Sequence, residues 1–175
     1  IVEGGESVVF TLQPQAAVTI IDQYTGDVKA IVGGRGDKTG SRTLNRATDT
    51  TRQPGSTFKV LAAFAPALDT AGMTLATVQD DAPFTYSNGT PLRNYDNSYR
   101  GFTTIRYAIT KSINVVTVKT LSDISPQLGF DYLKNFGFTT LTQDDVVQSL
   151  ALGGITQGVT NLELTAAYAT MANSG

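Results

Sequence analysis

The hydrophobic residues near the start of the chain gather in two short runs that are rich in β-branched residues. Residues 17–22 and 28–32 flank a turn that contains Gly26, and this pattern predicts a β-hairpin. Gly33 and Gly34 end the second run, and a polar, glycine-rich loop follows them. Because a two-stranded ribbon is only marginally stable in water, we expect helices to cover it or further strands to extend it.

From residue 56 onward the apolar positions repeat mostly at helical spacing. This pattern predicts helices over residues 56–72, 103–110, 114–124, 125–137 and 159–175. Pro66 predicts a kink or an early end in the first helix, and Ser125 before Pro126 is a suitable N-cap for the fourth. Residues 80–102 are rich in Asp, Asn, Pro, Gly and Tyr, and they predict a long irregular segment of the kind that often lies over a functional site.

The chain therefore opens with strands and becomes mostly helical, which indicates an α/β protein of the α+β type. Its 175 residues suit one domain, or most of one. The sequence begins with Ile1 and shows neither a leader pattern nor an apolar run long enough to span a bilayer. We expect a piece of a longer protein, with any membrane anchor outside it.

The amino-acid composition limits the chemistry that the chain can perform. It has no Cys and no His, which excludes Cys/His zinc sites, disulfides, a Ser-His-Asp triad and a cysteine nucleophile. The net charge is −2, and no Lys/Arg cluster lies on a predicted helix face, so we expect no nucleic-acid partner and no anionic membrane surface as a partner. Any nucleophile must be Ser or Thr, with a Lys, carboxylate or Tyr as its base.

Ser56 and Lys59 form the first candidate pair. On a helix, positions i and i+3 share a face, so both side chains point the same way. Pro54 and Gly55 place Ser56 in the first turn, where free N–H groups and the helix dipole favour a developing anion and lower the pKa of Lys59. Burial among apolar neighbours lowers this pKa further, and a neutral lysine can act as the base for a serine. For the motif alone, a serine that only caps the helix remains the simpler interpretation.

Ser112 and Asn114, in the sequence KSIN, form the second candidate pair. In an extended segment or a turn their side chains point the same way. A hydroxyl and an amide beside a nucleophile can relay a proton and hold a substrate amide. Taken in isolation, a solvated Ser and Asn at a helix boundary is the better explanation of this pattern.

Together these residues resemble the transpeptidase domain of class A (bifunctional) penicillin-binding proteins. The family's Ser-x-x-Lys motif matches Ser56 and Lys59, and its Ser-x-Asn motif matches Ser112 and Asn114. The similarity extends to the segments IDQYTGDVKAIVGG, LNRAT, RQPGSTFK, LRNYDNSYRGFTTIRYAITKSIN and ALGGITQGVTNLELTAAYATMANSG. It implies a single partial domain over residues 1–175 with the penicillin-binding-protein/β-lactamase-like serine transpeptidase fold, in which an N-terminal hairpin precedes a mostly helical remainder and later sheet strands are missing.

The resemblance also implies a reaction and a location. Ser56 attacks the D-alanyl-D-alanine carbonyl of a peptidoglycan stem peptide, and an amine of a neighbouring stem captures the acyl-enzyme. Lys59 takes the Ser56 proton, Ser112 passes a proton to the leaving amine, and Asn114 binds substrate. β-Lactams acylate the same serine, which makes such a protein an antibiotic target, and neither cofactor nor metal is involved. The expected location is the extracytoplasmic face of the bacterial membrane, reached through an upstream anchor.

The family's third motif, Lys-Thr/Ser-Gly, is expected on a strand well after the second. The chain contains Lys38, Thr39 and Gly40, but they precede Ser56, so we interpret this match as a coincidence. The strand with the true motif would supply the second oxyanion donor and bind the substrate carboxylate. We therefore expect the chain to be weakly active or inactive alone, with an exposed sheet edge, and to require the remainder of the transpeptidase domain.

Three related functions remain as alternatives. A class A β-lactamase would carry Glu-x-x-Leu-Asn, which is absent here, and Glu163 is predicted to be a surface residue of the last helix. A D,D-carboxypeptidase uses the same chemistry, although the surrounding residues fit it less well. A non-catalytic β-lactam sensor is disfavoured because all four motif residues are intact.

Overall fold

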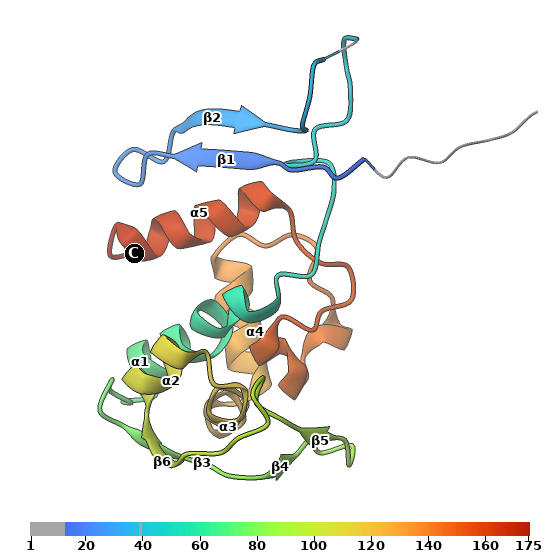
Figure 1. The fold of residues 1–175 in the computed structure, drawn as a ribbon. Helices are drawn as coiled ribbons and strands as arrows, with labels where there is room; N and C mark the ends of the chain where they lie inside the picture. The colour runs from blue at the N-terminus through green and yellow to red at the C-terminus, as the bar shows by residue number, and fades with distance from the viewer. Residues whose placement is uncertain (1–12, 39) are drawn as a thin grey trace, which may run out of the picture.

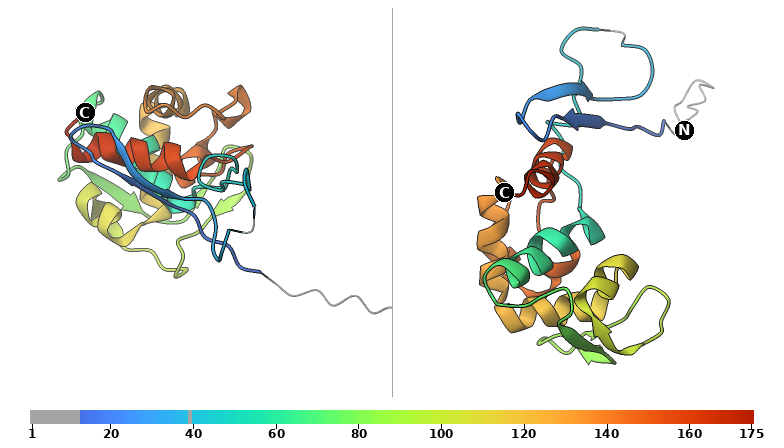
Figure 2. Two further views of the ribbon diagram at one scale, coloured as in Figure 1. Left: turned by 90° about the horizontal axis from the view of Figure 1, so that it is seen from above. Right: turned by 90° about the vertical axis from the view of Figure 1, so that its left-hand side faces the viewer.

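The structure, a computed structural model, describes residues 13–38 and 40–175. A β-hairpin lies at one end, the C-terminal helix lies beneath it, and a helical body with small β-ribbons forms the other end (Figure 1). The right-hand view of Figure 2 shows the same order from the side. The segment that leads into the predicted nucleophile runs from the hairpin down into the helical body (Figure 1).

The hairpin consists of β1 (Val18–Ile21) and β2 (Val28–Val32), paired antiparallel with Val18 opposite Val32. The predicted hairpin is therefore confirmed. The helix α5 (Asn161–Ala172) packs against β1, so a helix does cover one side of the ribbon. Within the described residues no third strand pairs with the hairpin, and Val18 and Val32 remain 51% and 52% exposed.

Helices make up most of the remaining structure. In chain order they are η1 (Gly55–Thr57), η2 (Val60–Phe64), α1 (Ala65–Asp69), α2 (Ile105–Lys111), α3 (Asn114–Ile124), α4 (Pro126–Asn135), η3 (Gln143–Asp145), η4 (Gln148–Leu152) and α5. The five predicted helices all exist. The Ser125 hydroxyl accepts from the N–H of Leu128, which confirms the predicted cap before Pro126.

The first predicted helix does not end early at Pro66. The chain turns as a 3-10 helix in η1, as a π-helix in η2 and as an α-helix in α1, so it continues through Pro66 to Asp69 instead of ending early. Pro66 has no N–H to donate and its ring would crowd the carbonyl one turn back. The wider π turn directly ahead of it accommodates both effects, which is a recognised origin of helix irregularity.

The predicted irregular segment 80–102 is in part regular. Four short strands, β3 (Val78–Asp81), β4 (Phe84–Thr85), β5 (Pro91–Leu92) and β6 (Gly101–Thr104), form two small antiparallel ribbons, β3 with β6 and β4 with β5. Strands of two to four residues leave too few alternating positions to be recognised against the many Asp, Asn and Gly residues. The prediction of an entirely irregular segment is therefore wrong.

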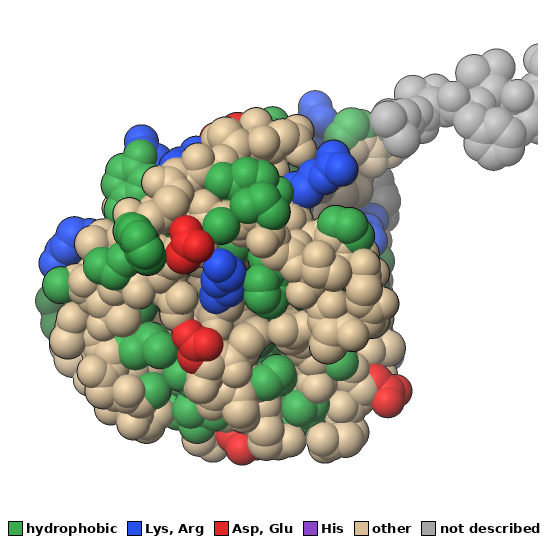
Figure 3. Space-filling view, turned by 90° about the horizontal axis from the view of Figure 1, so that it is seen from below, with side chains coloured by type: hydrophobic (Ala, Val, Ile, Leu, Met, Phe, Trp, Pro, Cys, Tyr) green, Lys and Arg blue, Asp and Glu red, His purple; other side chains and the backbone are tan. Residues whose placement is uncertain are grey.

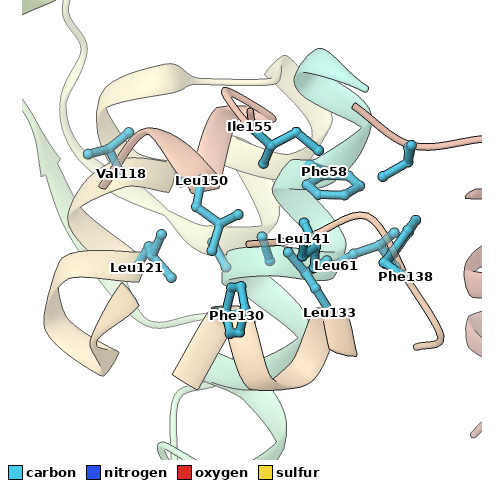
Figure 4. Packing of buried hydrophobic residues seen from close by; sticks show 14 of the residues in the cluster. Phe58, Leu61, Val118, Leu121, Phe130, Leu133, Phe138, Leu141, Leu150 and Ile155 are labelled. Atoms are coloured by element: carbon cyan, nitrogen blue, oxygen red, sulfur yellow. The ribbon is translucent and has the colours of Figure 1, made fainter. Parts of the chain in front are cut away.

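The main core lies where η2, α3, α4 and η4 meet. Phe58 packs against Phe138 with ring centroids 5.0 Å apart, and Leu61, Leu133 and Leu150 are fully buried around them (Figure 4). Phe58 and Leu61 flank Lys59 and Val60 in the sequence. The helix that carries the predicted catalytic pair is thus anchored in the centre of the core, which restricts its movement.

The face of the molecule opposite the hairpin has a mixed surface. Lys and Arg side chains do not gather into a basic patch on it, and apolar and acidic side chains lie between them (Figure 3). Among the described residues, no helix combines the length and the apolar character that crossing a membrane requires.

Candidate active site

Ser56 lies in the first turn of its helix, directly after a tight bend. Gly55 has a φ of +56°, in the left-handed region that glycine adopts without steric cost, and the 3-10 turn η1 begins there. Ser56 lies in this turn and Lys59 follows it in the helix at position i+3, so the two residues share one helix face. The Ser56 residue is exposed to solvent, so a substrate can approach it.

Lys59 has the most fully defined contacts of the four motif residues. It is 3% exposed, and its Nζ donates to Ser112 O at 2.5 Å, to Ser112 Oγ at 2.9 Å and to Asn114 Oδ1 at 2.6 Å. An ammonium group has three N–H bonds, so these three oxygen atoms satisfy it completely. The structure therefore brings Lys59, Ser112 and Asn114 into one cluster, with Ser56 one turn away.

Burial changes the protonation of this lysine. Desolvation lowers the pKa of Lys59 from its ordinary value of 10.5 to about 8, in the direction that the sequence predicts. At pH 7 a lysine with this pKa is neutral in about one molecule in ten. A usable fraction of the protein therefore holds a lysine that can accept a proton.

Ser112 reaches Lys59 because the backbone leaves the helical path at this residue. The helix α2 ends at Lys111, and Ser112 follows in the left-handed region with φ 52° and ψ 47°. For a non-glycine residue this conformation costs about 1–2 kcal/mol, and it persists where the surroundings fix the backbone. Ile113, only 2% exposed, anchors the link in the core before α3 begins at Asn114.

The residues that precede Ser56 are held by a distant segment. The Gln53 side chain donates through Nε2 to the carbonyl of Ile155 and accepts from the N–H of Ile155 at 3.2 Å. Arg52 and Val159 exchange both backbone hydrogen bonds at 2.9 Å. These contacts join two segments about a hundred residues apart in the sequence and fix the approach to the nucleophile.

Two glycines allow this close packing. A Cβ atom at Gly153 would lie 2.5 Å from the backbone N and O of Gly55, and one at Gly158 would lie 2.6 Å from the carbonyl of Arg52. Real Cβ contacts are not that short, so the segment from 153 to 158 can approach the nucleophile turn only with glycine at both positions. The glycines of GGITQG are the sequence signal that could have indicated this contact, which was not predicted.

Arg93 and Asn94 are also missing from the predicted site. Asn114 donates through Nδ2 to Arg93 O at 2.9 Å, and Asn94 Oδ1 accepts from the backbone N–H groups of Asn114 and Val115 at 3.0 and 3.1 Å. Both residues belong to the segment between β5 and β6. This segment therefore contacts the second motif directly.

Some predicted features are not joined to the cluster. No hydrogen bond links the Ser56 hydroxyl to Lys59 Nζ in the described part of the chain. Thr39 of the early Lys-Thr-Gly match lies outside the described residues, while Lys38 lines a hollow of about 620 Å³ beside β2. A second hollow, of about 520 Å³, is lined by Gln53 and Thr57. Neither hollow includes Ser56, which lies on the open surface.

Glu163 is not the simple surface residue that the sequence predicts. Its carboxylate accepts from the N–H and hydroxyl of Thr139, at 2.9 and 2.6 Å, and from the N–H and hydroxyl of Thr160, both at 2.9 Å. Partial burial alone would raise the pKa of Glu163, but these hydrogen bonds outweigh it and hold the pKa below its ordinary value. Glu163 closes a capping box at the start of α5 and ties it to the loop at Thr139.

Comparison with known proteins identifies the family to which the chain is similar. The family model described as the penicillin binding protein transpeptidase domain matches residues 16–175. Penicillin-binding protein 1A/1B of Bacillus subtilis is 34% identical over 173 residues, covering 98% of this chain and 19% of that protein. Penicillin-binding protein 1A of Neisseria lactamica is 40% identical over 168 residues, covering 92% of this chain and 20% of that protein. The chain thus spans about a fifth of the length of these relatives.

Solved structures agree with the sequence relatives. The penicillin-binding protein PonA1 of Mycobacterium tuberculosis in complex with penicillin V superposes with a TM-score of 0.79 at 26% identity, covering 93% of this chain and 44% of that chain. Penicillin-binding protein 1A of Haemophilus influenzae gives a TM-score of 0.76 at 28% identity, covering 89% and 23%. The predicted fold, a penicillin-binding-protein transpeptidase fold with few strands, is confirmed. The chain belongs to the penicillin-binding protein transpeptidase domain family.

Proposed function

We propose that this chain is part of a peptidoglycan D,D-transpeptidase in which Ser56 forms the acyl-enzyme. The observation that carries the proposal is the buried Lys59, held by Ser112 and Asn114 one turn from an exposed serine. Membership of the transpeptidase domain family supports the reaction class. The penicillin V complex of a structural relative supports β-lactams as ligands.

The proposed first step is acylation. Neutral Lys59 removes the proton from the Ser56 hydroxyl, and the oxygen attacks the carbonyl carbon of the terminal D-alanyl-D-alanine amide. The free N–H groups at the start of η1 lie at the positive end of the helix and favour the negative charge that develops on the carbonyl oxygen. The C–N bond then breaks, the ester on Ser56 remains, and the leaving D-alanine amine takes up the proton.

Ser112 and Asn114 have separate roles in this proposal. The Ser112 hydroxyl, 2.9 Å from Lys59 Nζ, passes the proton from the lysine to the leaving amine. The amide of Asn114 binds the substrate peptide. In the second step an amine of a neighbouring stem peptide attacks the ester, forms the cross-link and releases Ser56.

A further part of the proposal concerns what lies outside these residues. After Asn114 the sequence contains no Lys-Thr-Gly or Lys-Ser-Gly. We assign the second oxyanion donor and the carboxylate-binding residues to another segment of the transpeptidase domain. Loss of one oxyanion donor costs about 10²–10³ in rate, so the chain alone should be weakly active or inactive. The complete protein would work at the extracytoplasmic face of the membrane, held by an upstream anchor.

Covalent labelling tests the proposal. The chain, and in parallel a chain extended through the third motif, would be incubated with benzylpenicillin and their intact masses recorded. We expect an adduct in the extended chain that is absent from its Ser56→Ala variant. A complete domain that is never labelled would contradict the proposal.

The lifetime of the adduct separates the related functions. An ester that persists for hours indicates a transpeptidase or a sensor, whereas rapid hydrolysis indicates a β-lactamase. Incubation with a stem peptide that ends in D-alanyl-D-alanine then distinguishes cross-linked product from simple loss of D-alanine, which would indicate a D,D-carboxypeptidase. A non-catalytic sensor would form no cross-linked product and would release no D-alanine.

A further inference from the structure

Asn94 has a buried side chain in which every polar atom of the amide contacts a neighbour. The residue is 5% exposed and lies between the small β3–β6 ribbon and the start of α3. Its Oδ1 accepts from the N–H groups of Asn114 and Val115, and its Nδ2 donates to Asp81 Oδ1 at 2.7 Å and to Ser98 O at 2.9 Å. The amide is therefore fully satisfied, and none of the proposed catalytic steps uses it.

The helix α3 depends on this amide for its cap. The first N–H groups of a helix have no partner within it, and the N-cap residue commonly supplies one through its side chain. Ile113 occupies the N-cap position of α3 and has no side chain that can accept. Asn94, 20 positions earlier in the chain, accepts from Asn114 in its place.

Asp81 fixes which way the Asn94 amide points. Asp81 is completely buried, and it accepts from Asn94 Nδ2 and from the N–H of Arg100 at 3.1 Å. If the amide were reversed, its NH₂ group would face the N–H groups of α3 and its oxygen would face the carboxylate. Both contacts would be repulsive, so only the observed orientation is stable.

We propose that Asn94, oriented by Asp81, is a positioning residue of the acylation site that acts through Asn114 on Lys59. Asn94 holds the backbone of Asn114, and the side chain of Asn114 in turn supplies one of the three oxygen atoms around Lys59 Nζ. This inference rests on the proposed function, because it assigns Asn94 to the support of the proposed base. It extends the site to the β3–β6 ribbon, which neither motif contains.

The test is a double-mutant cycle read out on the ammonium group. The titration midpoint of Lys59 would be followed by NMR of ¹³C-labelled lysine in the unmodified chain, in Asn94→Leu, in Asn114→Leu and in the double variant. The Lys59→Met variant identifies the signal by its loss. Because each single change removes or loosens one acceptor of a buried ammonium, we expect each to lower the midpoint by about one pH unit.

Coupling between the two positions decides the outcome. If Asn94 acts through Asn114, then Asn94→Leu produces no additional shift in the Asn114→Leu background. An unchanged midpoint in Asn94→Leu, or an equal shift in both backgrounds, would overturn the inference. If the leucine variant does not fold, Asn94→Ser takes its place in the cycle.

Asp145→Asn is the matched control for a purely structural effect. Asp145 is a carboxylate that is 1% exposed and accepts from the N–H groups of Thr142 and Thr156 at 2.9 and 2.7 Å. We expect this variant to lower the melting temperature and leave the Lys59 midpoint unchanged. The titration of Lys59 does not depend on acylation. Failure of benzylpenicillin labelling would therefore contradict the proposed function, whereas the action of Asn94 on Lys59 would still be decided by the titration.

Discussion

The Nζ atom of Lys59 lies 2.6 Å from Oδ1 of Asn114, although 55 positions separate the two residues in the sequence. This contact joins the helix of the first motif to the start of the helix of the second. Because Lys59 is also buried, its charged form is stabilised by a small set of oxygen atoms rather than by water. The protonation of Lys59 should therefore be visible both in stability and in reactivity.

The first prediction concerns stability at alkaline pH. The pKa of Lys59 is about 8 in the folded protein and near 10.5 in the unfolded chain, so between these values the unfolded chain binds more protons. Stability then rises with pH across this window. We expect the unfolding free energy of the unmodified chain to increase by about 3 kcal/mol, relative to Lys59→Met, between pH 8 and pH 10.5. Urea unfolding of both proteins over this range measures it.

Two controls accompany this measurement. Below about pH 7 the difference in unfolding free energy between the two proteins should be nearly constant, because Lys59 is then mostly protonated in both the folded and the unfolded state. Lys134→Met, at an exposed residue of α4, is the control for the loss of one lysine charge outside the core. If the difference in unfolding free energy between the unmodified chain and Lys59→Met did not change up to pH 10.5, Lys59 would not be desolvated in the way the structure indicates.

The sequence predicts those parts of the fold that depend on neighbours in the chain. The hairpin and the break between α2 and α3 follow from local runs of β-branched and helical residues, and their limits agree within a few residues. The π turn before Pro66 was not predicted. A proline inside a helical pattern can end the helix, kink it or follow a wider turn, and the packing around it decides between these outcomes.

The four motif residues were candidates from their residue types and spacing, and the resemblance to a family identified them as one site, whereas the residues that support them could not be read from the sequence. Asn94 and Gln53 each contact a partner far along the chain, and a single Asn or Gln in a polar segment has no local pattern that distinguishes it. The catalytic roles of Ser56, Lys59, Ser112 and Asn114 remain predictions. The structure adds the placement of three of them in one hydrogen-bonded cluster.

A second prediction tests the contact behind the nucleophile turn. Gly153 has a φ of +73°, and a Cβ there would lie 2.5 Å from the backbone of Gly55. Gly137 has a φ of +93°, and a Cβ there would have no other atom within 4 Å, so it is the matched control. We expect Gly137→Ala to cost about 1–2 kcal/mol from backbone strain and Gly153→Ala to cost about 1–3 kcal/mol more from overpacking.

Chemical denaturation of the two alanine variants gives the comparison. Equal losses of unfolding free energy would mean that the segment from 153 to 158 can move away from Gly55 at no cost. In that case it would not hold the nucleophile turn.

A third prediction concerns the carboxylate that closes the start of α5. Glu163→Gln keeps the shape of the side chain but places an NH₂ group among the donors of Thr139 and Thr160. We expect a loss of about 1 kcal/mol at pH 7, the usual size for a lost helix cap. Because the pKa of Glu163 lies below its ordinary 4.5, this contribution is present above that value and disappears as pH falls through the lowered pKa.

Thermal unfolding at pH 7 and at successively lower pH checks this sign. Asp131→Asn, at an exposed carboxylate of α4, is the control and should change stability little at either pH. A Glu163→Gln effect that grows on acidification would contradict the assignment of the carboxylate as the acceptor.

The most direct test of the account is the pH dependence of Ser56 acylation by benzylpenicillin, measured by intact mass on the chain extended through the third motif. If Lys59 must be neutral to take the serine proton, the rate rises about tenfold per pH unit below its pKa and reaches a plateau with a midpoint near 8. Lys59→Met should abolish the rise. A rate that is independent of pH between 6 and 9, or one that Lys59→Met leaves intact, would contradict the assignment of Lys59 as the base for Ser56.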